Sequence, residues 1–111
     1  MIHISNQFIQ EMTDKIVKEI HPQMIVLFGS YAKGTARPDS DLDFLIVEDG
    51  PFDAQRSRRA ETTKLWKLFF DCRVPLDFLV YTPEEVQKWQ SSRNHVVAHA
   101  MKEGKVLYER R

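Results

Sequence analysis

Three aspartates and a glycine–serine pair are the residues of this 111-residue chain whose types and spacing could do chemistry. Gly29 and Ser30 close one apolar run, and after ten further residues Asp41-Leu42-Asp43 opens another. Side chains alternate between the faces of a strand, so Asp41 and Asp43 point the same way. Carboxylate oxygens suit Mg²⁺, and a Gly-Ser turn at a helix start can hold phosphate through backbone N–H groups. The pattern predicts a magnesium-dependent site acting on a nucleoside triphosphate.

A third carboxylate, Asp77, lies inside the apolar run 74–81, which predicts a strand. An ionised aspartate among Leu, Phe and Val would carry a heavy desolvation cost unless a cation paired with it. A metal ion shared with Asp41 and Asp43 would be such a partner. The alternative is that Asp77 lies at a strand end, hydrated or bonded to a nearby cation.

This order of Gly-Ser, Asp-x-Asp and a later strand aspartate resembles the polymerase-beta-type nucleotidyltransferase superfamily, and most of all its minimal nucleotidyltransferase (MNT) domains. The resemblance implies that Gly29 and Ser30 bind the β- and γ-phosphates of ATP or another NTP. It also implies that Asp41 and Asp43 ligate two Mg²⁺ ions and that Asp77 completes the metal site on the acceptor side. The activity implied is transfer of a nucleoside monophosphate, AMP in the case of ATP, to a hydroxyl group.

Two cations, Lys33 and Arg37, flank the predicted phosphate turn. Each either contacts the triphosphate or the leaving pyrophosphate, or is a solvated loop charge. Asp39 and Ser40 are predicted to be turn residues, with Ser40 fixing the approach of Asp41.

The fold class predicted is α/β, a small mixed sheet packed against helices, as in the polymerase-beta-type fold that the resemblance implies. Apolar periodicity and capping signals predict a helix before the first strand, a short helix after it, and further helices that alternate with the later strands. The predicted helices cover 5–20, a short stretch from 30, 53–72, a stretch from 82, and 91–103; the predicted strands cover 24–28, 42–48, 74–81 and 106–108, with a turn at 37–39.

Length and composition predict a single domain over residues 1–111. Sixteen basic and sixteen acidic residues give zero formal net charge, which argues against nucleic acid as the partner. No run is long enough to predict a membrane span, and the first residues lack the pattern of a signal peptide, so we expect a cytoplasmic protein. The single cysteine, Cys72, can form no internal disulfide.

Two functions stay open at this point. The first is an enzyme, a nucleotidyltransferase, favoured because all five motif positions keep the residues that the chemistry needs. The second is a non-catalytic antitoxin or assembly subunit that binds nucleotide and masks a partner. MNT domains resemble the antitoxin half of HEPN/MNT toxin–antitoxin pairs, which implies a separate small helical partner of the HEPN type. A homo-oligomer is also open.

Overall fold

The computed structural model describes residues 4–37 and 39–110. Its strands form one mixed sheet in the order β3-β2-β1-β4, in which β1 is antiparallel to β2 and β4, and β2 is parallel to β3. The predicted α/β class with a small mixed sheet is therefore confirmed. The elements in chain order are α1 (Asn6–Ile20), β1 (Met24–Phe28), α2 (Ser30–Lys33), β2 (Leu42–Val47), α3 (Arg58–Leu68), β3 (Leu76–Tyr81), α4 (Pro83–Trp89), α5 (Val96–Glu103) and β4 (Lys105–Glu109).

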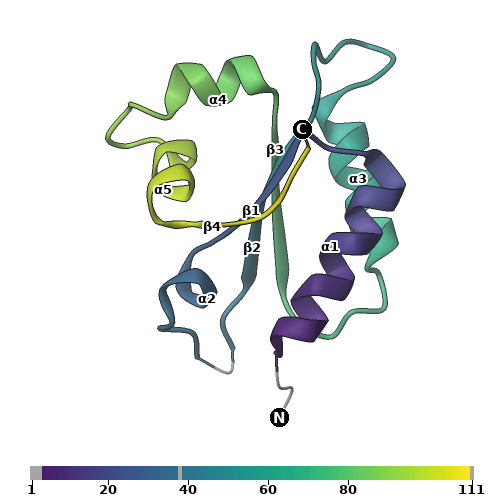
Figure 1. Ribbon diagram of the computed structural model, residues 1–111. Helices are drawn as coiled ribbons and strands as arrows, with labels where there is room; N and C mark the ends of the chain where they lie inside the picture. Colours follow the sequence, from purple (N-terminus) through teal and green to yellow (C-terminus); the bar gives the residue numbers. More distant parts are fainter. Residues whose placement is uncertain (1–3, 38, 111) are drawn as a thin grey trace.

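Helices cover both faces of the sheet (Figure 1). One apolar cluster joins the sheet to α1 and α3 through fully buried residues such as Ile16 and Leu65. A second cluster joins the opposite face to α4 and α5 through Val86, Val97 and Ala100. Because both faces are covered, the inner strand β2 is apolar at almost every position rather than alternating with polar residues.

Side-chain alternation places two of the three aspartates on the face of α4 and α5. In β2, Leu45 packs in the α4/α5 cluster, and Asp43 lies two residues before it on the same face. In β3, Leu79 packs against the same cluster, and Asp77 precedes it by two residues. Both aspartates stand near the first residues of their strands, at the end of the sheet where β1 finishes and α2 begins (Figure 1).

Helix α3 is shorter at both ends than the predicted helix 53–72. The Oδ1 atom of Asp53 accepts hydrogen bonds from the N–H groups of Gln55 and Arg56, at 2.9 and 2.8 Å, which closes a turn before the helix. Ser57 then caps the helix, accepting from the N–H of Ala60 at 3.0 Å. Local hydrogen bonding by an aspartate side chain competes with helix formation, so the prediction was wrong over these first residues.

Helix α5 begins at Val96 rather than at 91, because His95 is its N-cap and its Nδ1 atom accepts from the N–H of Val97 at 3.1 Å. The first helix matches its prediction, with Ser5 as the N-cap. The predicted turn at 37–39 includes residue 38, which lies outside the described residues. Across the described ranges, no helix combines the length and apolar character needed to cross a bilayer.

Candidate functional site

The turn after β1 depends on Gly29. Its backbone angles, φ 76° and ψ −157°, fall in a region that is essentially restricted to glycine. A Cβ atom at this position would collide with Oδ2 of Asp43, because Phe28 and Asp43 are partners in the β1–β2 ladder. Gly29 is therefore needed twice: for the conformation of the turn and for the close approach of its backbone to a carboxylate.

Ser30 starts the single turn of α2, directly after Gly29. The turn is closed by a hydrogen bond from the Lys33 N–H to the Gly29 carbonyl at 3.2 Å and ends at Gly34, which has φ 75°. The first N–H groups of a helical turn find no acceptor within it. Ser30, which is half-buried, and these N–H groups thus follow directly after the residue whose backbone lies against the Asp43 carboxylate.

Three carboxylates gather beside this turn. Asp43 and Asp77 are direct partners in the parallel β2–β3 register, and Asp41 precedes Asp43 by two residues. Asp43 is partly buried, while Asp41 and Asp77 are exposed. Burial, followed by the negative charges of Asp77 and Asp41, raises the pKa of Asp43 from 3.8 to about 6. Asp43 is therefore close enough to both of the other carboxylates to feel their charge.

The burial expected for Asp77 is wrong. Asp77 is exposed because β3 is an edge strand and this position lies at its start, outside the cover that α4 and α5 provide further along. The desolvation cost falls instead on Asp43, in the inner strand β2. The run of apolar residues therefore identified the strand correctly, but it did not identify which aspartate carries the desolvation cost of burial.

The donor set fits Mg²⁺. Within residues 4–37 and 39–110, no three His, Cys, Asp or Glu side chains already converge as ligands of one metal ion. Mg²⁺, however, is usually bound by one or two carboxylates together with water and substrate phosphates. Asp41, Asp43 and Asp77 supply hard oxygen atoms, and no ion pair among the described residues neutralises them. Burial first, and then the neighbouring Asp77 and Asp41 charges, raise the pKa of Asp43, and a bound cation would oppose this rise.

The two flanking cations differ in their surroundings. Lys33 forms an ion pair with Glu103 of α5, with 2.9 Å between Nζ and Oε2. Arg37 is exposed. Its backbone N–H donates to the Ser40 hydroxyl at 2.7 Å, and its carbonyl accepts from the Ser40 N–H at 3.0 Å. The turn role predicted for Ser40 is confirmed. The sequence analysis did not identify Glu103 as a contact of Lys33; the only local signal is an acid in the last turn of a helix, where the helix dipole disfavours negative charge.

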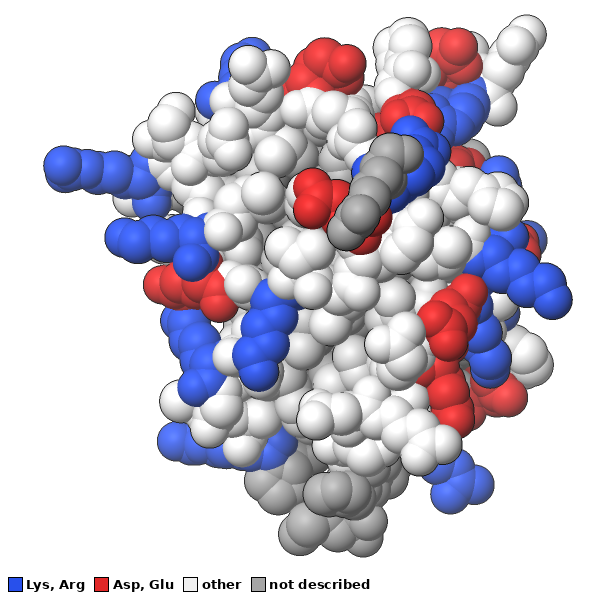
Figure 2. All heavy atoms as spheres, in the orientation of Figure 1, with Lys and Arg blue, Asp and Glu red and all other residues white. Residues whose placement is uncertain are grey.

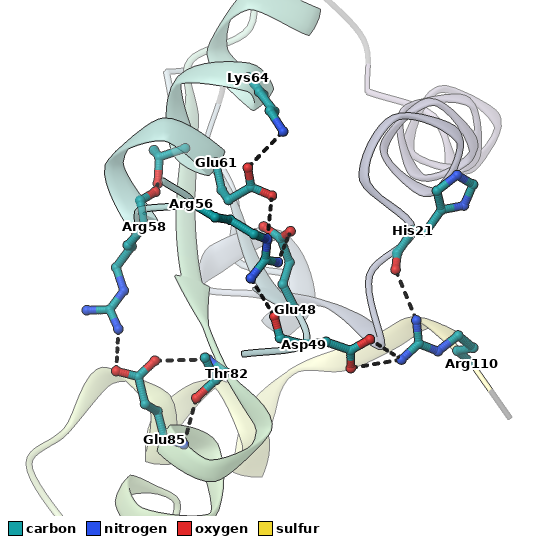
Figure 3. Close-up of polar contacts among 11 residues, drawn as sticks. His21, Glu48, Asp49, Arg56, Arg58, Glu61, Lys64, Thr82, Glu85 and Arg110 are labelled. Atoms are coloured by element: carbon teal, nitrogen blue, oxygen red, sulfur yellow. Dashed lines mark hydrogen bonds and ion pairs between the residues drawn. The ribbon is translucent and has the colours of Figure 1, made fainter. Parts of the chain in front are cut away.

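A second group of ionisable side chains lies beyond the other end of β2 (Figure 3). Glu48 and Glu61 are both buried, and Arg56 reaches them at 3.0 and 3.7 Å, while Lys64 pairs with Glu61 at 2.9 Å. Burial, and next its contact with Glu61, raises the pKa of Glu48 to about 8. Oε2 of Glu48 has no hydrogen-bond partner among the described residues, which agrees with the raised pKa of this buried carboxyl. This cluster anchors α3 to the sheet, away from the aspartates.

Comparisons with known proteins agree with this geometry. A family model described as a nucleotidyltransferase domain matches residues 11–76, which include the glycine turn and the Asp-x-Asp pair. A candidate protein adenylyltransferase from Methanocaldococcus jannaschii is 36% identical over 87 residues, covering 76% of this chain and 76% of that protein. A bifunctional uridylyltransferase/uridylyl-removing enzyme from Streptomyces coelicolor is 36% identical over 64 residues, covering 58% of this chain. The match spans only 7% of that enzyme's length.

The fold has solved counterparts. A toxin–antitoxin structure determined with AMP-PNP superposes with a TM-score of 0.56 at 22% identity, covering 92% of this chain and 74% of that one. At that identity the likeness concerns the fold. The family model spans more than half of the chain, and the archaeal relative aligns over three quarters of it. This chain belongs to the nucleotidyltransferase domain family.

Proposed function

We propose that this domain transfers AMP from ATP to a hydroxyl group on a partner protein, with Mg²⁺ as cofactor. The observation that carries the proposal is the meeting of a phosphate-type turn with three carboxylates at one end of the sheet. Gly29 approaches Asp43 closely, and Asp43 is the ladder partner of Asp77. The name of the archaeal relative supports AMP and a protein acceptor, and the AMP-PNP complex supports an adenine nucleotide.

In this reaction, the acceptor oxygen forms a bond to the α-phosphorus of ATP, and the bond from that phosphorus to the bridging oxygen breaks. Pyrophosphate leaves, and the hydroxyl proton passes to a carboxylate oxygen. Asp77 suits that last role because it is exposed on an edge strand, where an acceptor can approach from solvent. Protons move efficiently only between groups within hydrogen-bond reach, so Asp77 and the acceptor must be adjacent.

The triphosphate is assigned to the turn at Gly29 and Ser30. The backbone N–H groups of α2 and the Ser30 hydroxyl donate to phosphate oxygens, and Lys33 and Arg37 add positive charge beside the leaving pyrophosphate. Asp41, Asp43 and Asp77 would hold Mg²⁺, which when bound neutralises phosphate charge and activates the acceptor oxygen. Preorganised groups of this kind lower the barrier because they need no rearrangement during the reaction.

The direct test is transfer of label from ATP labelled at the α-phosphate. The purified chain, MgCl₂ and the product of the neighbouring gene are incubated, and the acceptor is examined by mass spectrometry for a covalent adenylate. Asp41→Asn and Asp43→Asn are each expected to lower the rate about a hundredfold or more, and Ser30→Ala about tenfold. Asp39→Asn is the matched control, since Asp39 lies in the same loop but outside the carboxylate group, and it is expected to retain the rate.

A second candidate function is masking of a partner protein without transfer. The exposed aromatic side chains Phe70 and Trp66, with 85% and 44% of their surface accessible, favour a surface that another protein covers. This candidate is supported, and the first excluded, if the partner binds tightly to both the wild type and Asp41→Asn and the wild type leaves no adenylate on the partner.

A further inference from the structure

A cavity of about 290 Å³ lies between the turn after α4 and the outer side of α5. Its lining is rich in hydrogen-bond donors: Ser91, Ser92, Arg93, His99 and Lys102, together with Glu103. We refer to these six residues as the α5 pocket. Nothing in the reaction proposed above uses them.

The positive groups of the α5 pocket are available to a ligand. Among the described residues, no side-chain hydrogen bond or ion pair engages Arg93, His99 or Lys102, and all three are exposed. The acid of the pocket, Glu103, is occupied by Lys33 at 2.9 Å. The pocket therefore offers two cations, Arg93 and Lys102, against a single acid, Glu103, that already pairs with Lys33, and this excess of positive charge favours anionic groups.

The pocket adjoins the candidate active site. Glu103 ends α5, and its contact with Lys33 links that helix directly to α2, which follows the Gly29 turn. Lys33 chiefly, and then His99 and Lys102 in smaller measure, lower the pKa of Glu103, so these three side chains lie close to one carboxylate. Figure 2 shows Lys and Arg side chains along the side of the molecule that carries α4, α5 and α2 in Figure 1. Acidic side chains interrupt them on this side, where Glu103 pairs with Lys33.

We propose that the α5 pocket binds carboxylate side chains of the protein acceptor and so holds an acidic segment of the partner beside the phosphate turn. The inference rests on the proposed function, because it assigns the way in which the acceptor is recognised. Arg93 can form two parallel hydrogen bonds with one carboxylate. Lys102 and His99, on α5, can bind a second carboxylate. An acceptor hydroxyl close to these acidic residues would then lie near Asp77 and the triphosphate.

A protein segment is favoured over nucleic acid for two reasons. The chain has equal numbers of basic and acidic residues, 16 of each, whereas nucleic-acid binding depends on neutralising several phosphates at once. The pocket is also a small, partly open depression of about 290 Å³, sized for a few side chains rather than for a phosphate backbone that continues past it.

The test measures binding and needs neither ATP nor metal. A fluorescein-labelled peptide with one tyrosine flanked by glutamates is compared, by fluorescence anisotropy, with the same peptide carrying glutamine in place of glutamate. The full chain is expected to bind the glutamate peptide about tenfold or more tightly than the glutamine peptide, with the difference shrinking at high salt. The double variant R93E/K102E is expected to lose this preference, and R93A/K102A to lose part of it.

The matched control is K18E/K67E, which makes the same change of charge on α1 and α3, across the sheet from the pocket. It is expected to bind the glutamate peptide as the wild type does, within about twofold. Equal binding of the two peptides, or equal losses in the pocket and control variants, would overturn the inference. Binding of a single-stranded RNA oligonucleotide that is tighter than the peptide and is lost in R93E/K102E would also overturn it, in favour of nucleic acid.

Failure of this inference can be told apart from failure of the proposed function. If peptide binding shows the expected preference but no adenylate transfer occurs, the pocket stands and the catalytic assignment falls. If transfer occurs, R93E/K102E is expected to raise the KM for the acceptor while leaving the KM for ATP and the kcat at saturating acceptor unchanged, because the pocket does not touch the reacting atoms.

Discussion

At the scale of single residues, Gly29 and Gly34 make a natural comparison. Both have positive φ, at 76° and 75°, but a Cβ at Gly29 meets the Asp43 carboxylate whereas at Gly34 nothing lies within 4 Å. Gly29→Ala is expected to destabilise the fold by about 1–3 kcal/mol through backbone strain alone, and to abolish nucleotide transfer by displacing Asp43. Urea unfolding and the transfer assay measure the two effects.

The control, Gly34→Ala, carries backbone strain of about 1–2 kcal/mol without any collision, and it is expected to keep most of the activity. Equal losses of activity in the two variants would mean that the turn conformation alone matters, and that the contact between Gly29 and Asp43 has no functional role.

If Lys33 binds the triphosphate as proposed, its ion pair with Glu103 competes for the same ammonium group. Glu103→Gln is expected to tighten ATP binding about two- to fivefold at low salt, since an exposed ion pair of this kind is weak and screened. Lys33→Met is expected to weaken binding. Isothermal titration of ATP checks both variants, with Glu109→Gln, a change at an exposed acid on β4, as the control. Unchanged affinity in Glu103→Gln would show that Lys33 does not reach the nucleotide.

At the scale of elements, the cluster of Glu48, Glu61, Arg56 and Lys64 makes the attachment of α3 sensitive to pH. The pKa of Glu48 is raised from 4.5 to about 8, so the folded state holds a proton that the unfolded state releases between these values. Stability is therefore expected to fall as the pH rises from about 5 to 8, by up to about 1.4 kcal/mol per pH unit, the value for one proton. Glu61 acts in the opposite sense: burial disfavours its charge, but Glu48 and Lys64 outweigh burial and lower its pKa, so its contribution is lost in acid, below this window.

Glu48→Gln checks this prediction, because the amide is similar in size to the protonated carboxyl, can donate a hydrogen bond and does not titrate. Urea unfolding across this pH range should show a flatter profile and greater stability at pH 8 than the wild type. Glu19→Gln, an exposed acid on α1, is the control. A profile that rises with pH in the wild type would mean that Glu48 is ionised in the folded state.

The sequence predicted which elements exist better than where they start. Periodicity and capping residues located α1 and every strand within a few residues, because those signals act locally. The late start of α3, at Arg58 rather than 53, was not predicted, because Asp53 and Ser57 both have local bonding options and only the packed structure decides between them. The order of the strands, with β4 beside β1, depends on contacts between distant segments that no local pattern records.

Some features of the candidate site could likewise be predicted from the sequence, and others could not. Gly29, Asp41 and Asp43 could be found from spacing, because a turn and a strand fix their relative positions. The exposure of Asp77 and the contact between Lys33 and Glu103 could not, since they depend on which strand forms the sheet edge and on how α5 meets α2.

At the scale of the whole molecule, binding of ATP with Mg²⁺ should stabilise the entire domain, because an unfolded chain has no such site. At a ligand concentration of about a hundred times Kd, the gain is about 2.7 kcal/mol. Thermal unfolding is expected to shift upward with MgATP and return to the ligand-free value when EDTA removes the metal. Asp43→Asn should unfold at the same temperature with and without MgATP; an equal upward shift in this variant would remove Asp43 from the metal site.

The parallel pairing of Asp43 with Asp77 also has a consequence for how the protein is made. The two residues are joined by a long crossover through α3, and a slip of one residue between β2 and β3 would turn one carboxylate to the opposite face of the sheet. A chain still being synthesised, or one trapped with β2 and β3 out of register, therefore does not bring Asp43 and Asp77 side by side on one face. During refolding, recovery of transfer activity would report correct alignment of the sheet edge, and a newly made copy would stay catalytically silent until its topology was complete.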